Sequence, residues 1–334
     1  MNILITSAGR RGYLIKYFKE ALNGKGLVIA GNSIDGVPAF KEADKTVVTP
    51  LVYDENYIPF LLNYCKENKV DAILSVYDVD VPVLAHYRKE FSDIGTRLVI
   101  SDEKFVRICN DKWLSYLYLK ENGIKTPKTY ISLQSVKDEL KNNQLTFPLI
   151  VKPRYGNGSI GLSVAYDEQE LDALFYLTEK SIHRTWLKYE SKQSNEIVIV
   201  QELLNGEEYG LDIIKDLQGN YQNTIVKKKL AMRAGETDSA IVEEDANLKA
   251  LGEKLAKISK HIANLDCDAF IVNGEVYILE MNARFGGGYP FSHIAGVNLP
   301  KAIVNWLNGK KVESSLLQAK TGVKSYKDID IKTY

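Results

Sequence analysis

The sequence predicts an α/β protein made of three consecutive parts, and a different pattern indicates each part. Short apolar strand runs alternate with helical stretches over the first part. A strand, a glycine-rich loop and a second strand mark the second part, and a hairpin pattern over residues 268–284 marks the third. We expect the parts to span residues 1–110, 111–195 and 196–334.

Bulk composition limits the classes of function. The 334 residues include 43 Lys plus Arg and 43 Asp plus Glu, so no net charge favours nucleic acid or acidic membranes. No apolar run reaches the ~18 residues that span a bilayer, and the N-terminus lacks the basic start of a signal peptide. The cysteines are scattered, without a CxxC pair: Cys65, Cys109 and Cys267. We therefore expect a cytoplasmic protein with reduced thiols, no zinc site, and neither nucleic-acid nor membrane partners.

The first part opens with a buried strand at Ile3–Thr6, a glycine turn and a helix over Tyr13–Leu22, which indicates a doubly wound fold. Helices are also expected at Tyr57–Glu67 and Val81–Glu90. The turn Gly9-Arg10-Arg11-Gly12 is not the GxGxxG fingerprint of dinucleotide binding. It either holds an anion at the helix start or is a plain tight turn. The further apolar runs that predict parallel strands are Leu27–Ala30, Lys45–Val48, Ala72–Val76 and Arg97–Ile100.

Three polar side chains near expected helix starts have two interpretations each. Asp78 and Asp80 follow the fourth strand and either cap the next helix or contact a substrate amine, and capping is the simpler interpretation. His293 follows a glycine-rich stretch that begins at Phe285, where the backbone can approach a ligand closely. It is either a catalytic base or a structural histidine at a helix start, and we favour the structural role.

The second part contains two lysines and a glycine loop. Asp111 is the predicted N-cap of a helix that ends before Gly123, and Lys112 would oppose the dipole of that helix, which suggests a separate task. Lys152 ends the strand that begins at Phe147. A strand rather than a helix follows the loop, so we predict a flap that covers phosphates with its N–H groups, with Lys112 and Lys152 neutralising phosphate oxygens. The loop residues concerned are Gly156, Gly158, Ser159 and Gly161.

The third part begins with a buried strand at Glu196–Leu204 and a turn into a second strand. This stretch either forms an apolar slot, backbone contacts and a ribose acceptor for a nucleotide, or is an ordinary hairpin with acidic ends. The basic run Val226–Glu236 is either a solvated face or a phosphate-binding loop, in which we prefer Arg233 to the three lysines. A helix with an apolar face at Asn247–Ile262 is expected in the core.

The hairpin pattern contains three oxygen-bearing side chains, those of Asp268, Glu280 and Asn282. Carboxylate and amide oxygens suit a hard cation such as Mg²⁺, which is usually bound by one or two carboxylates together with nucleotide phosphates. The alternative is an ordinary half-buried hairpin whose polar face meets water.

The register of the hairpin decides whether these side chains can act together. A two-residue Asn273-Gly274 turn would place Asp268 opposite Leu279 and separate it from Glu280. A three-residue loop that begins at Val272 pairs Asp268 with Ile278 instead, and puts the three polar side chains on one face. The other face is then largely apolar, with Ala269, Ile271, Tyr277, Leu279 and Met281. We therefore predict the three-residue loop.

The sequence Glu280-Met-Asn282-Ala-Arg284, preceded by Asp268 and an Asn-Gly turn, resembles the metal-binding hairpin of the ATP-grasp superfamily. Biotin carboxylase and the large subunit of carbamoyl phosphate synthase are the members to which it is most similar. The resemblance covers roughly residues 1–308 and implies an ATP-grasp fold with an N-terminal Rossmann-like domain, a lid and a C-terminal α/β domain. It also implies that Asp268, Glu280 and Asn282 bind Mg²⁺ or Mn²⁺, and that Arg284 and Arg233 are catalytic residues near the phosphates.

The same resemblance implies the position of ATP. Lys112 and Lys152 match the two nucleotide lysines of the family, and the glycine loop matches its mobile small loop. The carbonyl of Glu202 and the amide of Leu204 would contact adenine, and Glu208 would bind the ribose. Gln201 replaces a glutamate that is common at its position and would contact the adenine amino group.

The activity implied is ATP-dependent ligation, in which a carboxylate or bicarbonate becomes an acylphosphate and an amine or other nucleophile displaces phosphate. The expected partners are small-molecule carboxylate and amine substrates, and a homodimer is compatible with the sequence. Complete carbamoyl phosphate synthase large subunits contain two such modules, and this chain has room for one, so it is carbamoyl-phosphate-synthase-like. A kinase of the same fold and a non-catalytic ATP sensor are the alternatives, whereas a dehydrogenase would need a dinucleotide fingerprint after the first strand.

Overall fold

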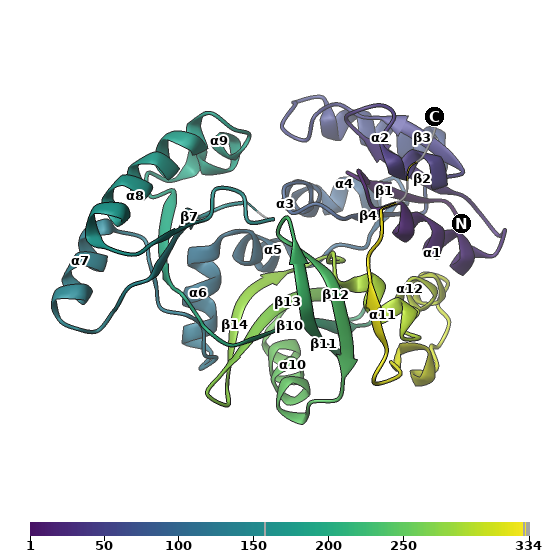
Figure 1. Cartoon of the computed structure of the whole chain (residues 1–334). Coiled ribbons are helices and arrows are strands. Elements are labelled where there is room, and N and C mark those ends of the chain that lie inside the picture. Colours follow the sequence, from purple (N-terminus) through teal and green to yellow (C-terminus); the bar gives the residue numbers. More distant parts are fainter. Residues whose placement is uncertain (157, 330, 332–334) are drawn as a thin grey trace.

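A computed structural model gives the structure of residues 1–156, 158–329 and 331, and its three sheets divide the chain into three parts (Figure 1). The N-terminal part and the lid lie on opposite sides of the molecule, and the large sheet of the C-terminal part lies below and between them. Helices α5 (Glu103–Asn110) and α6 (Lys112–Glu121) connect the N-terminal part to the lid. The three parts border a common cleft.

The N-terminal part is a five-stranded parallel sheet in the order β3-β2-β1-β4-β5, as the strand and helix alternation predicted. The helix expected at residues 81–90 is divided in two. The strands are β1 (Ile3–Thr6), β2 (Val28–Asn32), β3 (Lys45–Val48), β4 (Ala72–Ser75) and β5 (Arg97–Leu98). The helices are α1 (Gly12–Leu22), η1 (Pro38–Glu42), α2 (Tyr57–Glu67), α3 (Asp80–His86) and α4 (Arg88–Asp93).

One buried acid ties together the carboxyl edge of this sheet. Asp80 accepts hydrogen bonds from the hydroxyl groups of Thr6 on β1, Ser75 on β4 at 2.7 Å and Tyr57 on α2 at 2.7 Å. The predicted helix cap is therefore wrong: the N-cap position of α3 is Val79, and Asp80 joins strand ends instead. Burial raises the pKa of Asp80, and the hydroxyl hydrogen bonds oppose that rise. This network holds the loops that follow β1 and β4 at the edge of the cleft.

The lid is a four-stranded antiparallel sheet in the order β6-β9-β7-β8. We expected the third part to begin at residue 196, but β9 pairs with β6 and β7, so the lid extends through β9. Its strands are β6 (Thr129–Tyr130), β7 (Leu149–Pro153), β8 (Ser163–Ala165) and β9 (Val198–Glu202). Its helices are α7 (Leu133–Lys141), α8 (Glu168–His183), α9 (Leu187–Glu190) and η2 (Ser191–Gln193).

Asp111 caps helix α6 as predicted. Its carboxylate accepts hydrogen bonds from the backbone nitrogens of Trp113 at 3.0 Å and Leu114 at 3.2 Å. It also forms a two-pronged ion pair with Arg154, at 2.8 and 2.7 Å. Because Arg154 directly follows β7, this buried pair fixes the base of the glycine loop to the start of α6.

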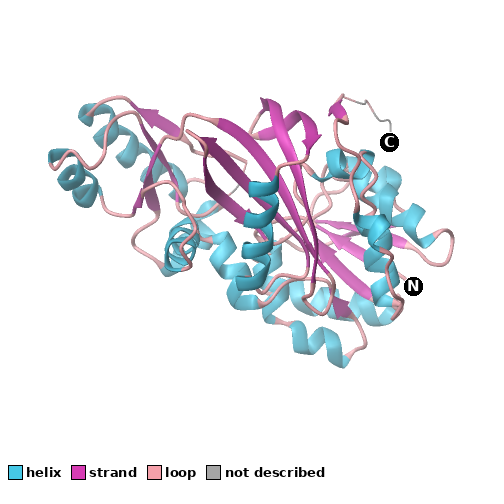
Figure 2. Cartoon of the chain, turned by 90° about the horizontal axis from the view of Figure 1, so that it is seen from below, coloured by secondary structure: helices cyan, strands magenta, loops and turns pink. Residues whose placement is uncertain are grey.

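The C-terminal part is a six-stranded antiparallel sheet in the order β14-β13-β10-β11-β12-β15. Helix α10 packs across β10 and β11 (Figure 2). The strands are β10 (Glu207–Lys215), β11 (Tyr221–Arg233), β12 (Glu236–Glu243), β13 (Ala263–Val272), β14 (Glu275–Asn282) and β15 (Lys324–Tyr326). The helices are α10 (Ala246–Ile258), α11 (Tyr289–Ile294), α12 (Leu299–Leu307) and η3 (Ser314–Leu317). Strand β15 was not predicted.

The turn of the β13–β14 hairpin differs from the prediction. Asn273 and Gly274 form a two-residue turn with φ values of 50° and 79°, and Val272 pairs with Glu275 on either side of it. These positive φ angles are the ones that a tight hairpin turn requires. The predicted three-residue loop is therefore wrong.

A bulge farther along the hairpin restores the arrangement that the longer loop was expected to produce. Leu279 is an extra residue in β14, so Asp268 lies opposite Glu280 rather than opposite Ile278. The bulge also exchanges two apolar side chains relative to the prediction. Ile278 is fully buried in the core, whereas Leu279 lines the cleft.

Cys65, Cys109 and Cys267 are all buried and free, and Cys267 belongs to the core beneath the hairpin. Within the described residues, no helix has both the length and the apolar character that crossing a membrane would require.

Candidate active site

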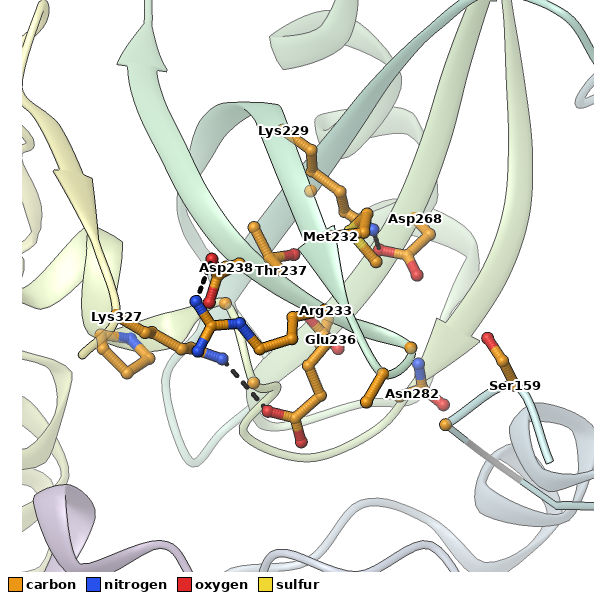
Figure 3. A pocket seen from close by; sticks show the side chains of 18 of the residues that line it. Ser159, Lys229, Met232, Arg233, Glu236, Thr237, Asp238, Asp268, Asn282 and Lys327 are labelled. Carbon is orange, nitrogen blue, oxygen red and sulfur yellow. Dashed lines mark hydrogen bonds and ion pairs between the residues drawn. The ribbon is translucent and has the colours of Figure 1, made fainter. Parts of the chain in front are cut away.

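A cleft of about 930 Å³ lies between the three parts and brings together most of the predicted site residues (Figure 3). Those that line it are Lys112, Lys152, Gly156, Gly158, Ser159, Glu208, Arg233, Asp268, Glu280, Asn282 and Arg284. Those outside its lining are Gly161, Gln201, Glu202 and Leu204.

One wall of the cleft is the acidic face of β13 and β14. Asp268 lies opposite Glu280, and Asp266 lies opposite Asn282, so the four side chains point to the same side. Asp266 was not among the predicted residues, although it is two positions before Asp268 and the strand period would have found it. Among the described residues, no three His, Cys, Asp or Glu side chains are arranged to hold a metal by themselves. Two carboxylates and an amide oxygen instead suit a cation shared with phosphate.

Lys229 on β11 reaches the same wall. Its Nζ lies 2.6 Å from Asp268 and 2.7 Å from Glu208, and Figure 3 shows the pair with Asp268. Burial lowers the pKa of Lys229, but the two carboxylates outweigh burial and raise it above the ordinary value. A permanent positive charge therefore lies against the acidic face.

The three consecutive lysines of β11, to which we preferred Arg233, point to different sides of the strand. Lys227 and Lys229 point to the interior, where Lys227 forms a buried ion pair with Asp212. Lys228 points to the other side of the strand. Side chains two residues apart share a face of a strand, so alternation would have separated Lys227 and Lys229 from Lys228 but not from each other.

Lys152 and Lys112 approach the cleft from the lid. Nζ of Lys152 donates a hydrogen bond to Oε1 of Gln201 at 2.7 Å in a buried environment. Burial and the charge of Lys112 lower the pKa of Lys152 to about 8, against the influence of Glu280 and Asp268. Two ammonium groups that repel one another suit a ligand with several negative charges.

The glycine loop contacts both sides of the cleft. Lys112 donates a hydrogen bond from Nζ to the carbonyl oxygen of Gly156, and its contact with phosphate stays a prediction. On the opposite side, the tip of the β11–β12 hairpin approaches so closely that a Cβ on Gly235 would lie 2.6 Å from the carbonyl oxygen of Gly158. Asn157, within the predicted loop, lies outside the described residues.

The stretch predicted to bind adenine lies beside the cleft. The buried side chain of Gln201 accepts from Lys152 and donates to Oγ1 of Thr129 at 2.8 Å. Both ends of its amide are used within the protein, which argues against the predicted contact with the adenine amino group. The backbone contacts of Glu202 and Leu204 with adenine stay predictions.

Arg284 links the C-terminal part to the N-terminal part. Its Nη2 lies 2.7 Å from Asp78 and its Nη1 lies 3.1 Å from Asp266. Burial lowers the pKa of Arg284, but the two carboxylates outweigh burial and raise it. Burial raises the pKa of Asp266 to about 6 against the influence of Arg284. The guanidinium is in the cleft wall, as predicted, but acids hold two of its nitrogens, and its contact with phosphate stays a prediction.

The other end of the cleft combines three segments that are far apart in the sequence. Arg11, from the loop after β1, lies 2.8 Å from Glu236, and Lys327, just after β15, lies 3.1 Å from the same carboxylate (Figure 3 shows the second pair). Arg233 pairs with Asp238 at 3.0 Å. The turn Gly9-Arg10-Arg11-Gly12, for which anion binding and a plain tight turn were both open, thus contributes Arg11. The polar tail carries no pattern that could have identified Lys327.

His293 has the structural role that we favoured. Its ring stacks on Tyr17 with 3.5 Å between centroids, and Nδ1 lies 3.3 Å from the hydroxyl of Tyr289. It lies at the end of α11 rather than at a helix start, and it is not part of the cleft lining. Burial lowers the pKa of His293.

Comparison with known families now identifies the class of protein. Residues 109–288 match the ATP-grasp domain, and residues 3–99 match the PylC-like, N-terminal domain. The first match covers more than half of the chain, so the protein belongs to the ATP-grasp family. The family and the fold predicted from the hairpin are confirmed.

Two curated relatives illustrate the range of similar proteins. The chain is 28% identical over 255 residues to a D-alanine–D-alanine ligase of Bacillus anthracis, covering 69% of this chain and 76% of that protein. It is 23% identical over 299 residues to the carbamoyl phosphate synthase large chain of Clostridium beijerinckii, covering 86% of this chain and 26% of that protein. The second match to about a quarter of a longer protein agrees with the single module expected here.

Solved structures have the same fold over most of the chain. An L-amino acid ligase from Bacillus licheniformis has a TM-score of 0.71 at 19% identity and covers 99% of this chain and 81% of its own. A biotin carboxylase from Campylobacter jejuni has a TM-score of 0.74 at 15% identity and covers 95% of this chain and 73% of its own. At these identities the likeness shows the ATP-grasp fold.

Proposed function

We propose that this protein is an ATP- and Mg²⁺-dependent ligase. It would phosphorylate a small-molecule carboxylate to an acylphosphate and couple it to an amine, with release of ADP and phosphate. The observation that carries the proposal is the facing pair Asp268 and Glu280 in the same cleft as Lys112 and Lys152. Carboxylates alone would repel a triphosphate, whereas carboxylates that face lysines suit a triphosphate bound with a metal ion. The similarity to two amino-acid ligases favours a carboxylate and an amine as substrates.

The acidic face has the donor set for a divalent cation. Asp268, Glu280 and Asn282 would hold Mg²⁺ or Mn²⁺ together with phosphate oxygens, and the ion would neutralise charge during phosphoryl transfer. Lys229 already pairs with Asp268. It therefore limits the accumulation of negative charge on this wall before a nucleotide binds.

The remaining predicted residues receive roles from their positions. Lys112 and Lys152 would bind the phosphate oxygens, and the glycine loop would cover them with backbone N–H groups. Glu208 would accept a ribose hydroxyl in exchange for its pair with Lys229. Arg233 and Arg284 are the candidates to contact the acylphosphate, and Arg284 would exchange an acid partner for a phosphate oxygen to do so.

The state of the cysteines supports a reaction without a covalent enzyme intermediate. Burial raises the pKa of Cys65 to about 12 and raises the pKa values of Cys109 and Cys267 as well. With such raised pKa values, the three cysteines are almost entirely protonated at neutral pH, and nucleophilic attack by a cysteine is therefore disfavoured.

Turnover of Mg-ATP with pooled small carboxylates and amines tests the proposal. ADP, free phosphate and new product masses are followed together in the wild type, in Glu280→Ala and in a control, Glu275→Ala. Glu275 is on the same strand and pairs with Lys125 at the surface, at 2.7 Å. ADP, phosphate and a condensed product that only Glu280→Ala loses would support the ligase.

Two other outcomes would contradict the ligase. A phosphorylated acceptor without free phosphate would identify a kinase of the same fold. No binding of Mg-ATP would overturn an ATP-dependent function altogether. Tight Mg-ATP binding without turnover of any pooled substrate would leave both a sensor and a ligase for other substrates open, and a wider substrate pool then separates the two.

A further inference from the structure

The end of the cleft away from Asp268 has a composition of its own. We define the tail corner as Arg11, Glu236 and the tail residues Tyr326–Ile329, all of which line the cleft. In Figure 3, Lys327 and Glu236 lie on the far side of the drawn cleft from Asp268. The tail corner is therefore separate from the acidic face that would hold the metal and phosphates.

Main-chain hydrogen bonds place Lys327 in the cleft. Strand β15 pairs with β12, with Tyr326 opposite Ser239, and the backbone nitrogen of Lys327 donates to the carbonyl oxygen of Asp238 at 2.7 Å. Before β15, the backbone nitrogen of Lys320 donates to Ala295 at 2.7 Å. The tail is thus attached to the sheet and to the end of α11 before it reaches the cleft, so its side chains there are held in position.

The charges at the tail corner leave room for an anion. Glu236 is shared by two cations, at 2.8 Å from Arg11 and 3.1 Å from Lys327. Asp328 also lines the cleft but forms no ion pair among the described residues, so Arg11 and Lys327 share the carboxylate of Glu236. A carboxylate on a ligand would give each of the two cations a partner of its own. Burial lowers the pKa of Lys327 and the charge of Arg11 lowers it too, whereas Glu236 and Asp238 oppose both effects.

Exposed apolar side chains line the same cleft. Tyr326 and Ile329 belong to the tail corner and Ile294 is on α11, and they are 78%, 70% and 59% exposed. Exposed apolar groups that gather in a cleft mark a binding site for an apolar body. The ligand that fits both features carries a carboxylate and an apolar group.

We propose that the tail corner binds the unreacted carboxylate of an apolar amino acid or a similar amphipathic acid. Lys327 and Arg11 contact this carboxylate, and Tyr326 and Ile329 contact the apolar body. The inference rests on the proposed ligase function, because it makes this acid one of the two substrates to be joined. It assigns to the tail a specificity role in selecting a substrate with a free carboxylate away from the metal-binding face.

Thermal-shift and calorimetric titrations with leucine, methionine and phenylalanine test the inference, each paired with its carboxamide. The variants are Lys327→Gln, the charge-preserving Lys327→Arg, and Lys324→Gln as a matched control. Lys324 is exposed, lies on the same strand opposite Ile241, and is outside the cleft lining. We expect at least one acid, but not its carboxamide, to bind the wild type. Lys327→Gln should weaken that binding about tenfold or more, while Lys327→Arg and Lys324→Gln largely retain it.

Several results would overturn the inference: no binding of any of the three acids, equal binding of acid and carboxamide, or unchanged affinity in Lys327→Gln. Titration of Mg-ATP into the same samples separates the two proposals. Mg-ATP binding that Glu280→Ala abolishes, without acid binding, would contradict the tail corner and leave the ligase standing. Acid binding that depends on Lys327, without Mg-ATP binding, would contradict the ligase and leave the tail corner standing.

Discussion

The acidic face and the tail corner are two ends of one cleft, but they are assembled differently. Asp268 and Glu280 face each other on a single hairpin, whereas Arg11, Glu236 and Lys327 come from the beginning, the later middle and the end of the chain. A hairpin largely specifies its own geometry, whereas contacts between distant segments depend on the complete fold. The difference explains why the acidic hairpin could be recognised in the sequence and the tail corner could not.

The largest expected effect is that of Glu280→Ala, which should change one end of the cleft and leave the other unchanged. Glu280→Ala removes one of the facing carboxylates, so Mg-ATP turnover should fall about a thousandfold, in line with the several kcal/mol that metal-ion charge stabilisation supplies. Leucine binding at the tail corner should be unchanged. Phosphate release and calorimetry measure the two effects, and Glu275→Ala should change neither. Loss of leucine binding together with turnover in Glu280→Ala would show that the ends are one site.

A smaller effect concerns pH at the nucleotide end. Lys152, with its pKa lowered to about 8, is charged below pH 8 and neutral above it. Bound phosphate favours the charged form, so the Kd for Mg-ATP should rise above pH 8, by up to about tenfold per pH unit. Lys152→Arg keeps its charge and should remove this rise between pH 7 and 9, as followed by calorimetry. A wild-type Kd that is flat over that range would contradict a phosphate contact for Lys152.

An effect of about tenfold is expected where the two ends meet. Gly235 has a φ of +77°, adjoins Glu236 and touches the carbonyl oxygen of Gly158. Gly235→Ala should displace the glycine loop and weaken Mg-ATP binding about tenfold, because forced overpacking costs roughly 1–3 kcal/mol. Gly219→Ala is the control, since Gly219 has a φ of +89° and no atom within 4 Å of an added Cβ. Equal Mg-ATP affinities in the two variants, measured by calorimetry, would argue against this contact.

The smallest effect lies outside both ends, where the lid meets the N-terminal part. Glu190 on α9 accepts a hydrogen bond from Asn110 at 2.8 Å, and the neighbouring Tyr189 stacks on Tyr53. Burial raises the pKa of Glu190 to about 7, against the effect of the Asn110 hydrogen bond. Because the folded state favours the protonated carboxyl of Glu190, this group contributes to the free energy of unfolding at low pH, and the contribution is lost as pH rises through about 7.

Glu190→Gln should therefore raise Tm at pH 8 by about 1–3 °C and change it little at pH 5. Calorimetric scans at both pH values check the difference. Asn110→Ala, which removes the hydrogen-bond donor, should leave a pH dependence at least as large as that of the wild type. The same Tm difference at pH 5 and pH 8 would show that Glu190 does not titrate as inferred.

The metal-binding hairpin shows how a correct conclusion came from an incorrect step. We predicted a three-residue loop because it alone placed Asp268 and Glu280 on one face. The turn has two residues, as Asn273-Gly274 indicates locally, and the bulge at Leu279 restores the common face. A bulge inserts one residue without changing the apolar composition, so the pattern alone could not locate it.

Asp80 and Asp111, two acids at expected helix starts, also show that local sequence predicts local contacts but not contacts between distant segments. Asp111 caps α6 as predicted, because a cap uses backbone groups of the next two or three residues. Asp80 instead joins Thr6, Ser75 and Tyr57, which come together only when the parallel sheet forms. Local sequence was sufficient for the first acid and insufficient for the second.

By itself, the sequence determined the alternation of strands and helices and the acidic hairpin, because periodicity, caps and turns act over a few neighbouring residues. The family followed from the resemblance of that hairpin to the ATP-grasp superfamily. The tertiary structure decided that β9 belongs to the lid and that Arg284 pairs with Asp78. It also decided that Lys327 enters the cleft beside Arg11. These contacts join residues separated by long stretches of chain, and only packing of the complete fold compensates the entropy of closing such loops.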